Sequence, residues 1–118
     1  MNSREKGKRG ERGWRDVLRA AGFQAHRGAQ YHGGPDSPDV RCPELPGFHF
    51  EVKAVERLNV WDAMAQAEAD AGPLKIPLLA HTRNRSGWLV TMRARDWLSL
   101  IRASGHSAQP PKSPEAAP

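Results

Sequence analysis

The chain has 118 residues, which fits one domain and leaves no room for a second. Its formal net charge of +5 favours polyanionic partners, nucleic acid first, because each phosphate that Lys or Arg neutralises releases counterions. The sequence has no membrane-length apolar run, no secretory stretch near its start and a single cysteine, which excludes an internal disulfide, so we expect a cytoplasmic protein.

The first predicted element is a helix from about Lys8 to Ala21. Apolar residues recur along it at the three- and four-residue spacing of a buried helix face, namely Trp14, Val17, Leu18 and Ala21. Gly22 follows at the position where helices commonly end. Gly10 and Gly13 lie inside the segment, and each costs the helix about 1 kcal/mol relative to Ala.

Strands are predicted next. Residues 23–27 and 39–41 are short candidates, and residues 28–38 between them form an irregular loop rich in Gly and Pro. Residues 48–55 follow a turn and alternate cleanly, which predicts a strand with two distinct faces. One face carries Phe48, Phe50, Val52 and Ala54, and the other carries His49, Glu51, Lys53 and Val55.

A second helix is predicted over residues 60–71, with Asn59 as its cap and Gly72 at its stop. Two further strands, residues 76–82 and 88–92, are expected to form a hairpin. This order of elements predicts an α/β fold with a mixed sheet that has one face covered by helices.

A third helix is predicted over residues 95–103, and its apolar side chains are expected to supply core: Trp97, Leu98, Leu100 and Ile101. The other tryptophans, Trp14, Trp61 and Trp88, are assigned to the core as well. Pro, Ser and Ala dominate the chain after Ser104. We therefore expect one folded domain over residues 1–104 and a disordered tail over residues 105–118.

The pattern that indicates chemistry is Pro38-Asp39 followed by Glu51-Val52-Lys53. Strand alternation puts Glu51 and Lys53 on one face, about 7 Å apart along the chain. Mg²⁺ takes carboxylate oxygens, water and substrate phosphate as ligands, so Asp39 and Glu51 beside a lysine are candidates for a magnesium site. The alternative is a Glu51–Lys53 ion pair on a solvated strand, with Asp39 in an ordinary turn.

Together with the run Lys6-Gly7-Lys8-Arg9-Gly10-Glu11-Arg12, this pattern resembles the PD-(D/E)XK nuclease superfamily. More narrowly, it is similar to archaeal-type Holliday-junction resolvases and related phage nucleases. The resemblance spans roughly residues 6–101 and implies a restriction-endonuclease-like fold, with a central mixed β-sheet flanked by helices. The chain departs from the resolvases in the loop over residues 27–38, where only Ser37 matches their serine-containing segment. This departure concerns junction specificity more than nuclease chemistry.

The resemblance also implies a role for each matching residue. Asp39 and Glu51 would ligate Mg²⁺, for which Mn²⁺ can substitute, with the Val52 carbonyl as a further ligand. Lys53 would act on the attacking water. Glu11 would complete the acidic cluster directly or through a water molecule.

Other residues are weaker candidates with simpler alternatives. The candidates for DNA contacts, otherwise solvated surface charges, are Lys8, Arg9, Arg12, Arg27, Arg83 and Arg85. Gln66 on the second helix is an accessory candidate, and Glu11 has the alternative of pairing with Arg15 at i,i+4. The histidines and Cys42 show no paired metal-ligand spacing, so no structural zinc site is expected.

The sequence thus predicts a metal-dependent endonuclease that hydrolyses DNA phosphodiester bonds at Holliday junctions or other branched DNA. A four-way junction has two strands to cut symmetrically, so we expect a homodimer, with Phe48, Phe50 or the second helix at its interface. Two alternatives stay open. One is a linear-duplex or nicking nuclease of the same fold, and the other is a non-catalytic DNA-binding module.

Overall fold

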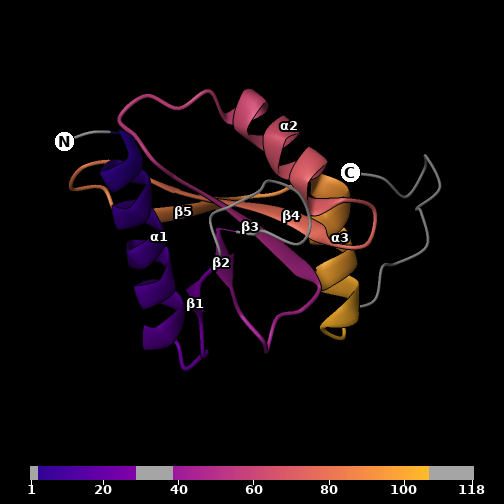
Figure 1. Cartoon of the computed structure of the whole chain (residues 1–118). Coiled ribbons are helices and arrows are strands. Elements are labelled where there is room, and N and C mark those ends of the chain that lie inside the picture. The colour runs from indigo at the N-terminus through magenta and orange to yellow at the C-terminus, as the bar shows by residue number, and fades with distance from the viewer. Residues whose placement is uncertain (1–2, 29–38, 107–118) are drawn as a thin grey trace.

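The computed structural model describes residues 3–28 and 39–106, in which a five-stranded sheet is flanked by helices (Figure 1). The strand order is β1-β2-β3-β4-β5. β3 and β4 are parallel and the other neighbours are antiparallel, so the sheet is mixed, as predicted. The elements are α1 (Ser3–Ala20), β1 (His26–Arg27), β2 (Val40–Arg41), β3 (Phe48–Ala54), α2 (Val60–Ala71), β4 (Ile76–Thr82), β5 (Trp88–Thr91) and α3 (Ala94–Ala103).

One face of the sheet packs against α1. Trp14 and Leu18 of this helix join Phe50 and Val52 of β3 in the larger apolar cluster. The Trp14 ring meets the Phe50 ring edge-on with 5.8 Å between centroids, and it lies 5.5 Å from the Trp88 ring. The alternation of β3 is therefore confirmed on its apolar side.

Two glycines let α1 approach the sheet closely. A Cβ atom on Gly10 would lie 3.0 Å from the Ala54 Cβ, and one on Gly13 would lie 2.9 Å from Cζ2 of Trp88.

Helix α1 begins at Ser3, so the predicted start at Lys8 is wrong. Glycine lowers helix propensity, but packing against a sheet outweighs a cost of about 1 kcal/mol per residue.

The opposite face of the sheet packs against α2, which connects the parallel strands β3 and β4. Ala63 and Met64 of α2 contact Leu79 of β4, whereas the neighbouring Leu78 and Ala80 belong to the α1 side. Helices therefore flank the sheet, as the resemblance implies, and the expectation of one covered face is too narrow, because β4 is apolar on both faces, as strands of parallel pairs commonly are.

The predicted bounds of α2 are confirmed. The Asn59 side-chain oxygen accepts a hydrogen bond from the Asp62 backbone N–H at 3.1 Å, which satisfies one of the N–H groups left open at a helix start. Gly72 follows the last turn with φ of 70°, a conformation that favours glycine. No helix of the described ranges is long and apolar enough to cross a membrane.

The third helix is more exposed than its periodicity predicts. None of its residues is buried, and Trp97 is 52% exposed. Trp61 of α2 is 74% exposed, so the assignment of these two tryptophans to the core is wrong. Amphipathic spacing shows that a helix has an apolar face, but it does not show how fully the rest of the chain covers that face.

Candidate metal centre

Glu51 lies in the middle of β3, on the face opposite Phe50, and only 4% of its surface is exposed. Lys53 lies on the same face, with its Nζ 3.9 Å from Oε2 of Glu51. Burial, and then the Asp39 carboxylate, raise the pKa of Glu51 to about 7, against the opposing charge of Lys53. The ion pair of the alternative is therefore present, but the solvated strand that it assumes is wrong at Glu51, because this carboxylate is buried.

Asp39 precedes β2 and is tied directly to β3. Its Oδ2 accepts a hydrogen bond from the Val52 backbone N–H at 2.8 Å. Burial raises the pKa of Asp39 to about 6, and the charge of Glu11 adds to this, while the hydrogen bond from Val52 and the charge of Lys53 oppose it. The Asp39 carboxylate is thus held beside the Val52 backbone, close enough for its charge to raise the pKa of Glu51.

Glu11 reaches the same neighbourhood from α1. It is 7% exposed, and its Oε1 accepts a hydrogen bond from Nε of Arg27 at 3.1 Å. Burial raises the pKa of Glu11, while the hydrogen bond and the charge of Arg27 oppose the rise. The alternative pairing of Glu11 with Arg15 is wrong, because Arg15 pairs with Asp16.

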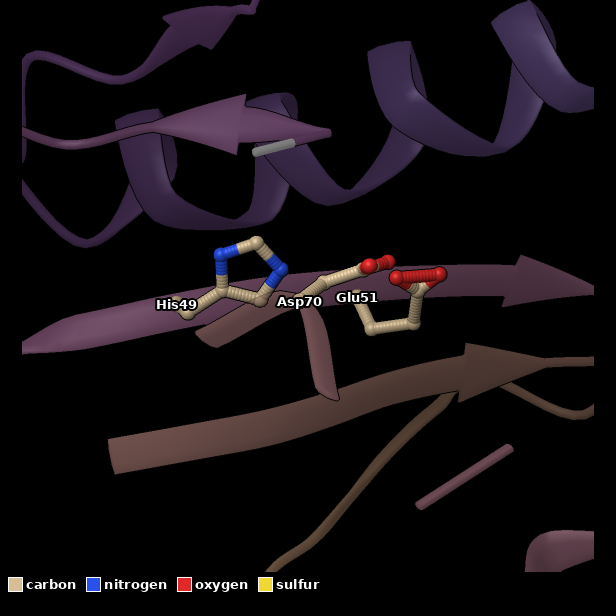
Figure 2. Close-up of side chains that lie close together, drawn as sticks. All are labelled: His49, Glu51 and Asp70. Atoms are coloured by element: carbon tan, nitrogen blue, oxygen red, sulfur yellow. The ribbon is translucent and has the colours of Figure 1, made fainter. Parts of the chain in front are cut away.

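The residues able to hold a metal ion together differ from the predicted set, because His49 and Asp70 join Glu51 in place of Asp39 and Glu11. Among the described residues, His49, Glu51 and Asp70 form a group able to hold a metal ion, with one ligand atom of each within 4.8 Å of the others. Figure 2 shows the His49 ring and both carboxylates converging from β3 and α2. Burial lowers the pKa of His49, which favours the neutral ring that ligates metals.

A basic groove lies at the end of β3, just beyond Lys53. Ala54 and Val55 line it, together with four basic side chains from α1 and the β4–β5 hairpin, namely Lys6, Arg9, Arg83 and Arg85. The hairpin loop lies beside the first turns of α1 (Figure 1). Two basic segments far apart in the sequence therefore meet on one surface, and β3 leads from this surface to the buried carboxylates.

The remaining predicted DNA contacts lie outside the groove lining. Nζ of Lys8 lies 3.8 Å from Oε1 of Glu5. Arg27 is engaged by Glu11, and the charge of Arg12 also acts on Glu11. Arg12 and Arg27 therefore support the acidic centre, whereas Arg9, Arg83 and Arg85 face an open groove.

Comparisons of the chain with protein-family models, curated proteins and solved structures give no match. The functional conclusion therefore depends on the geometry of this centre.

The sequence contains a signal for one of the two added residues. His49 alternates with Glu51 on one strand face, so the strand pattern already places it beside the motif. Asp70 comes from α2, and its position near Glu51 depends on how α2 crosses the sheet, which no local pattern records. Gln66 is exposed and lies one helical turn before Asp70, so it stays a candidate at the rim of the centre.

Proposed function

We propose that this chain is a metal-dependent endonuclease that hydrolyses DNA phosphodiester bonds, at Holliday junctions or other branched DNA. The observation that supports this proposal is a pair of buried carboxylates, Asp39 and Glu51, with Lys53 beside them and a basic groove beyond. This combination places cation ligands next to a surface suited to a phosphate backbone.

The donor set fits a hard divalent cation. Burial raises the pKa of both Asp39 and Glu51, so the surrounding protein groups do not fully compensate their charged forms. In the proposed enzyme, Asp39, Glu51 and the Val52 carbonyl hold Mg²⁺ or Mn²⁺, and Glu11 supports them directly or through a water molecule. The ion supplies Lewis acidity toward water and the phosphate, and it neutralises charge at phosphorus.

Lys53 is the cationic group suited to act on the attacking water. Its side chain is 31% exposed while that of Glu51 is 5% exposed, so its ammonium lies between the buried carboxylate and solvent. From this position Lys53 orients a water molecule or stabilises negative charge that develops on the phosphate. Glu51, 3.9 Å away, holds the ammonium in place.

The preference for branched DNA rests on the resemblance to the resolvases. Two symmetric cuts in a four-way junction favour a homodimer. Phe50 is 3% exposed and packs in the core, so its predicted role at a dimer interface is wrong. Leu89 and Val90 of the edge strand β5 are 64% and 55% exposed, and they offer apolar surface for pairing of two copies.

Cleavage of a labelled four-way junction and a matched linear duplex, in Mg²⁺ and in EDTA, tests the proposed function. Wild type should cut the junction only with metal. Glu51→Gln and Asp39→Asn should each lower the rate by about 100-fold or more, because each removes an anionic ligand. Lys53→Met should lower it by about 100-fold, as loss of one charge-stabilising group does elsewhere.

Asp62→Asn is the matched control, because Asp62 is an exposed carboxylate on α2 that lies outside the lining of the basic groove. This variant should cut at the wild-type rate. Equal cutting of both substrates would keep the nuclease and replace the junction specificity with the linear-duplex alternative. Tight binding of DNA without cleavage in Mg²⁺ or Mn²⁺ would overturn the enzyme and leave a binding module.

A further inference from the structure

His49 is buried beside the centre without the hydrogen bonding that a buried imidazole requires. Only 1% of its surface is exposed, and its Nδ1 has no hydrogen-bond partner. Most buried polar atoms in folded proteins are paired, so a buried imidazole without this pairing calls for a physical explanation. None of the groups assigned to phosphodiester hydrolysis above uses this ring.

The Nε2 atom of the ring faces two carboxylates, whereas the unpaired Nδ1 lies on the opposite side of the ring (Figure 2). In Figure 2 the imidazole is turned toward Glu51, which lies two residues along β3, and toward Asp70, which comes from α2. One ligand atom of each residue lies within 4.8 Å of the other two. Ligand atoms about 2.1 Å from one ion lie at most about 4.2 Å apart, so small side-chain movements bring all three into coordination distance.

We propose that His49, Glu51 and Asp70 form a binding site for a divalent first-row transition-metal ion, Mn²⁺ foremost. Mg²⁺ binds through oxygen ligands and retains several waters. Imidazole nitrogen instead suits transition metals, and two carboxylates keep the site suitable for Mn²⁺. The nitrogen of His49 is therefore the group that distinguishes this site from one built of Asp39 and Glu51 alone.

The proposed transition-metal site shares Glu51 with the magnesium ligands proposed above. Its own aspartate approaches Glu51 from a different element than Asp39 does. Asp39 approaches β3 from β2, while Asp70 approaches it from α2. Glu51 lies between them, and the charges of both aspartates raise its pKa. If the proposed nuclease function holds, Mn²⁺ should support cleavage at a lower concentration than Mg²⁺, and His49 should set that preference.

Mn²⁺ binding to the full wild-type chain, followed by electron paramagnetic resonance, tests the site directly. The expected result is binding with a pulsed-resonance coupling to ¹⁴N of a coordinated imidazole. This readout needs no variant, so it does not depend on how well a substituted protein folds. Binding of Mn²⁺ without nitrogen coupling, or no binding, would overturn the proposal.

Two pairs of variants assign the ligands. Asp70→Asn should weaken Mn²⁺ binding at least about tenfold, whereas Asp62→Asn, an exposed aspartate on the same helix, should leave it unchanged. His49→Gln should abolish the nitrogen coupling. His81→Gln should retain it, because His81 is occupied by a hydrogen bond with Oγ1 of Thr91 at 2.9 Å. Equal Mn²⁺ affinity of Asp70→Asn and wild type would contradict the ligand set.

The outcomes separate this site from the proposed function. Nitrogen-coupled Mn²⁺ in a protein that cuts no DNA would keep the metal site and remove the nuclease. If the protein cuts DNA with Mg²⁺ but its bound Mn²⁺ shows no nitrogen coupling, the proposed nuclease function stands. The proposal that His49 ligates the metal is then overturned. If both hold, His49→Gln should raise the Mn²⁺ concentration needed for half-maximal cleavage at least about tenfold and leave that for Mg²⁺ unchanged.

Discussion

The Glu51 carboxylate lies among groups that disfavour its charge. Burial raises its pKa from an ordinary 4.5 to about 7, and the carboxylates of Asp39, Asp70 and Glu11 add to the rise. The folded protein therefore binds a proton at Glu51 more tightly than the unfolded chain does. The contribution of Glu51 to the free energy of unfolding is therefore fully present below pH 4.5, and it is lost as the pH rises through about 7.

Metal-free protein should accordingly become less stable between pH 5 and 8. We expect Glu51 to account for a loss on the order of 2 kcal/mol over this range, since one pKa unit corresponds to about 1.4 kcal/mol. Glu51→Gln should keep only the smaller decline that arises from Asp39, whose pKa is raised to about 6, and from Glu11, whose pKa is also raised. Urea denaturation in EDTA at several pH values measures the difference.

For this stability measurement the exposed Glu56 provides the control, and Glu56→Gln should follow the wild-type pH dependence. A saturating divalent cation should flatten the decline in wild type, because a bound cation replaces the proton in stabilising the carboxylate. A pH dependence of Glu51→Gln equal to that of wild type would show that this carboxylate is not the source of the effect.

For single residues, strand alternation and motif spacing were enough to predict that Glu51, Lys53 and Asp39 lie near one another. They were not enough to predict the position of Asp70, which lies near Glu51 only because α2 connects the parallel strands β3 and β4 and packs on the sheet. The pairing of Glu11 with Arg27 was missed for a similar reason, since these residues lie on different elements. A sequence pattern records neighbours along one element, and contacts between elements depend on packing.

Among the elements, α1 shows how packing overrides propensity. A Cβ atom on Gly13 would lie 2.9 Å from the Trp88 ring, which packs against Trp14. We therefore expect Gly13→Ala to destabilise the protein by about 1 to 3 kcal/mol, the range for overpacking, although Ala is the better helix former. Thermal or urea unfolding measures this change.

Gly7 is the matched control within the same helix, because a Cβ atom there would have nothing within 4 Å. Gly7→Ala should be neutral or stabilise the protein by up to about 1 kcal/mol. If both variants were stabilised equally, the close approach of α1 to Trp88 would not exist in solution.

The elements with local boundary signals were predicted well. β3 has clean alternation, and α2 has a cap at Asn59 and a stop at Gly72. The exposure of α3 was missed because its apolar spacing is real, yet its side chains are only partly covered in the described structure. Periodicity thus predicted the existence of elements, while burial depended on the assembled fold.

Over the whole molecule, basic residues from distant segments gather beside one end of β3. Lys6 and Arg9 come from α1, while Arg83 and Arg85 come from the β4–β5 hairpin, and all four line the same groove. The formal net charge of +5 alone indicates only a preference for polyanions. The positive charge of the groove lies next to Lys53 and Glu51. A phosphate backbone bound in the groove would therefore lie close to the buried carboxylates.

The double variant Arg83→Gln/Arg85→Gln should weaken DNA binding at low salt for junctions and duplexes alike. Each lost phosphate contact lowers the slope of log affinity against log salt by about 1, so the double variant should lower it by about 2. Mn²⁺ affinity should stay unchanged, because neither arginine belongs to the metal-binding group. Arg102→Gln, an exposed arginine on α3, is the control and should leave the slope nearly unchanged. Filter binding over a range of salt concentrations measures the slope, and equal slopes for the double variant and wild type would exclude this groove from the DNA path.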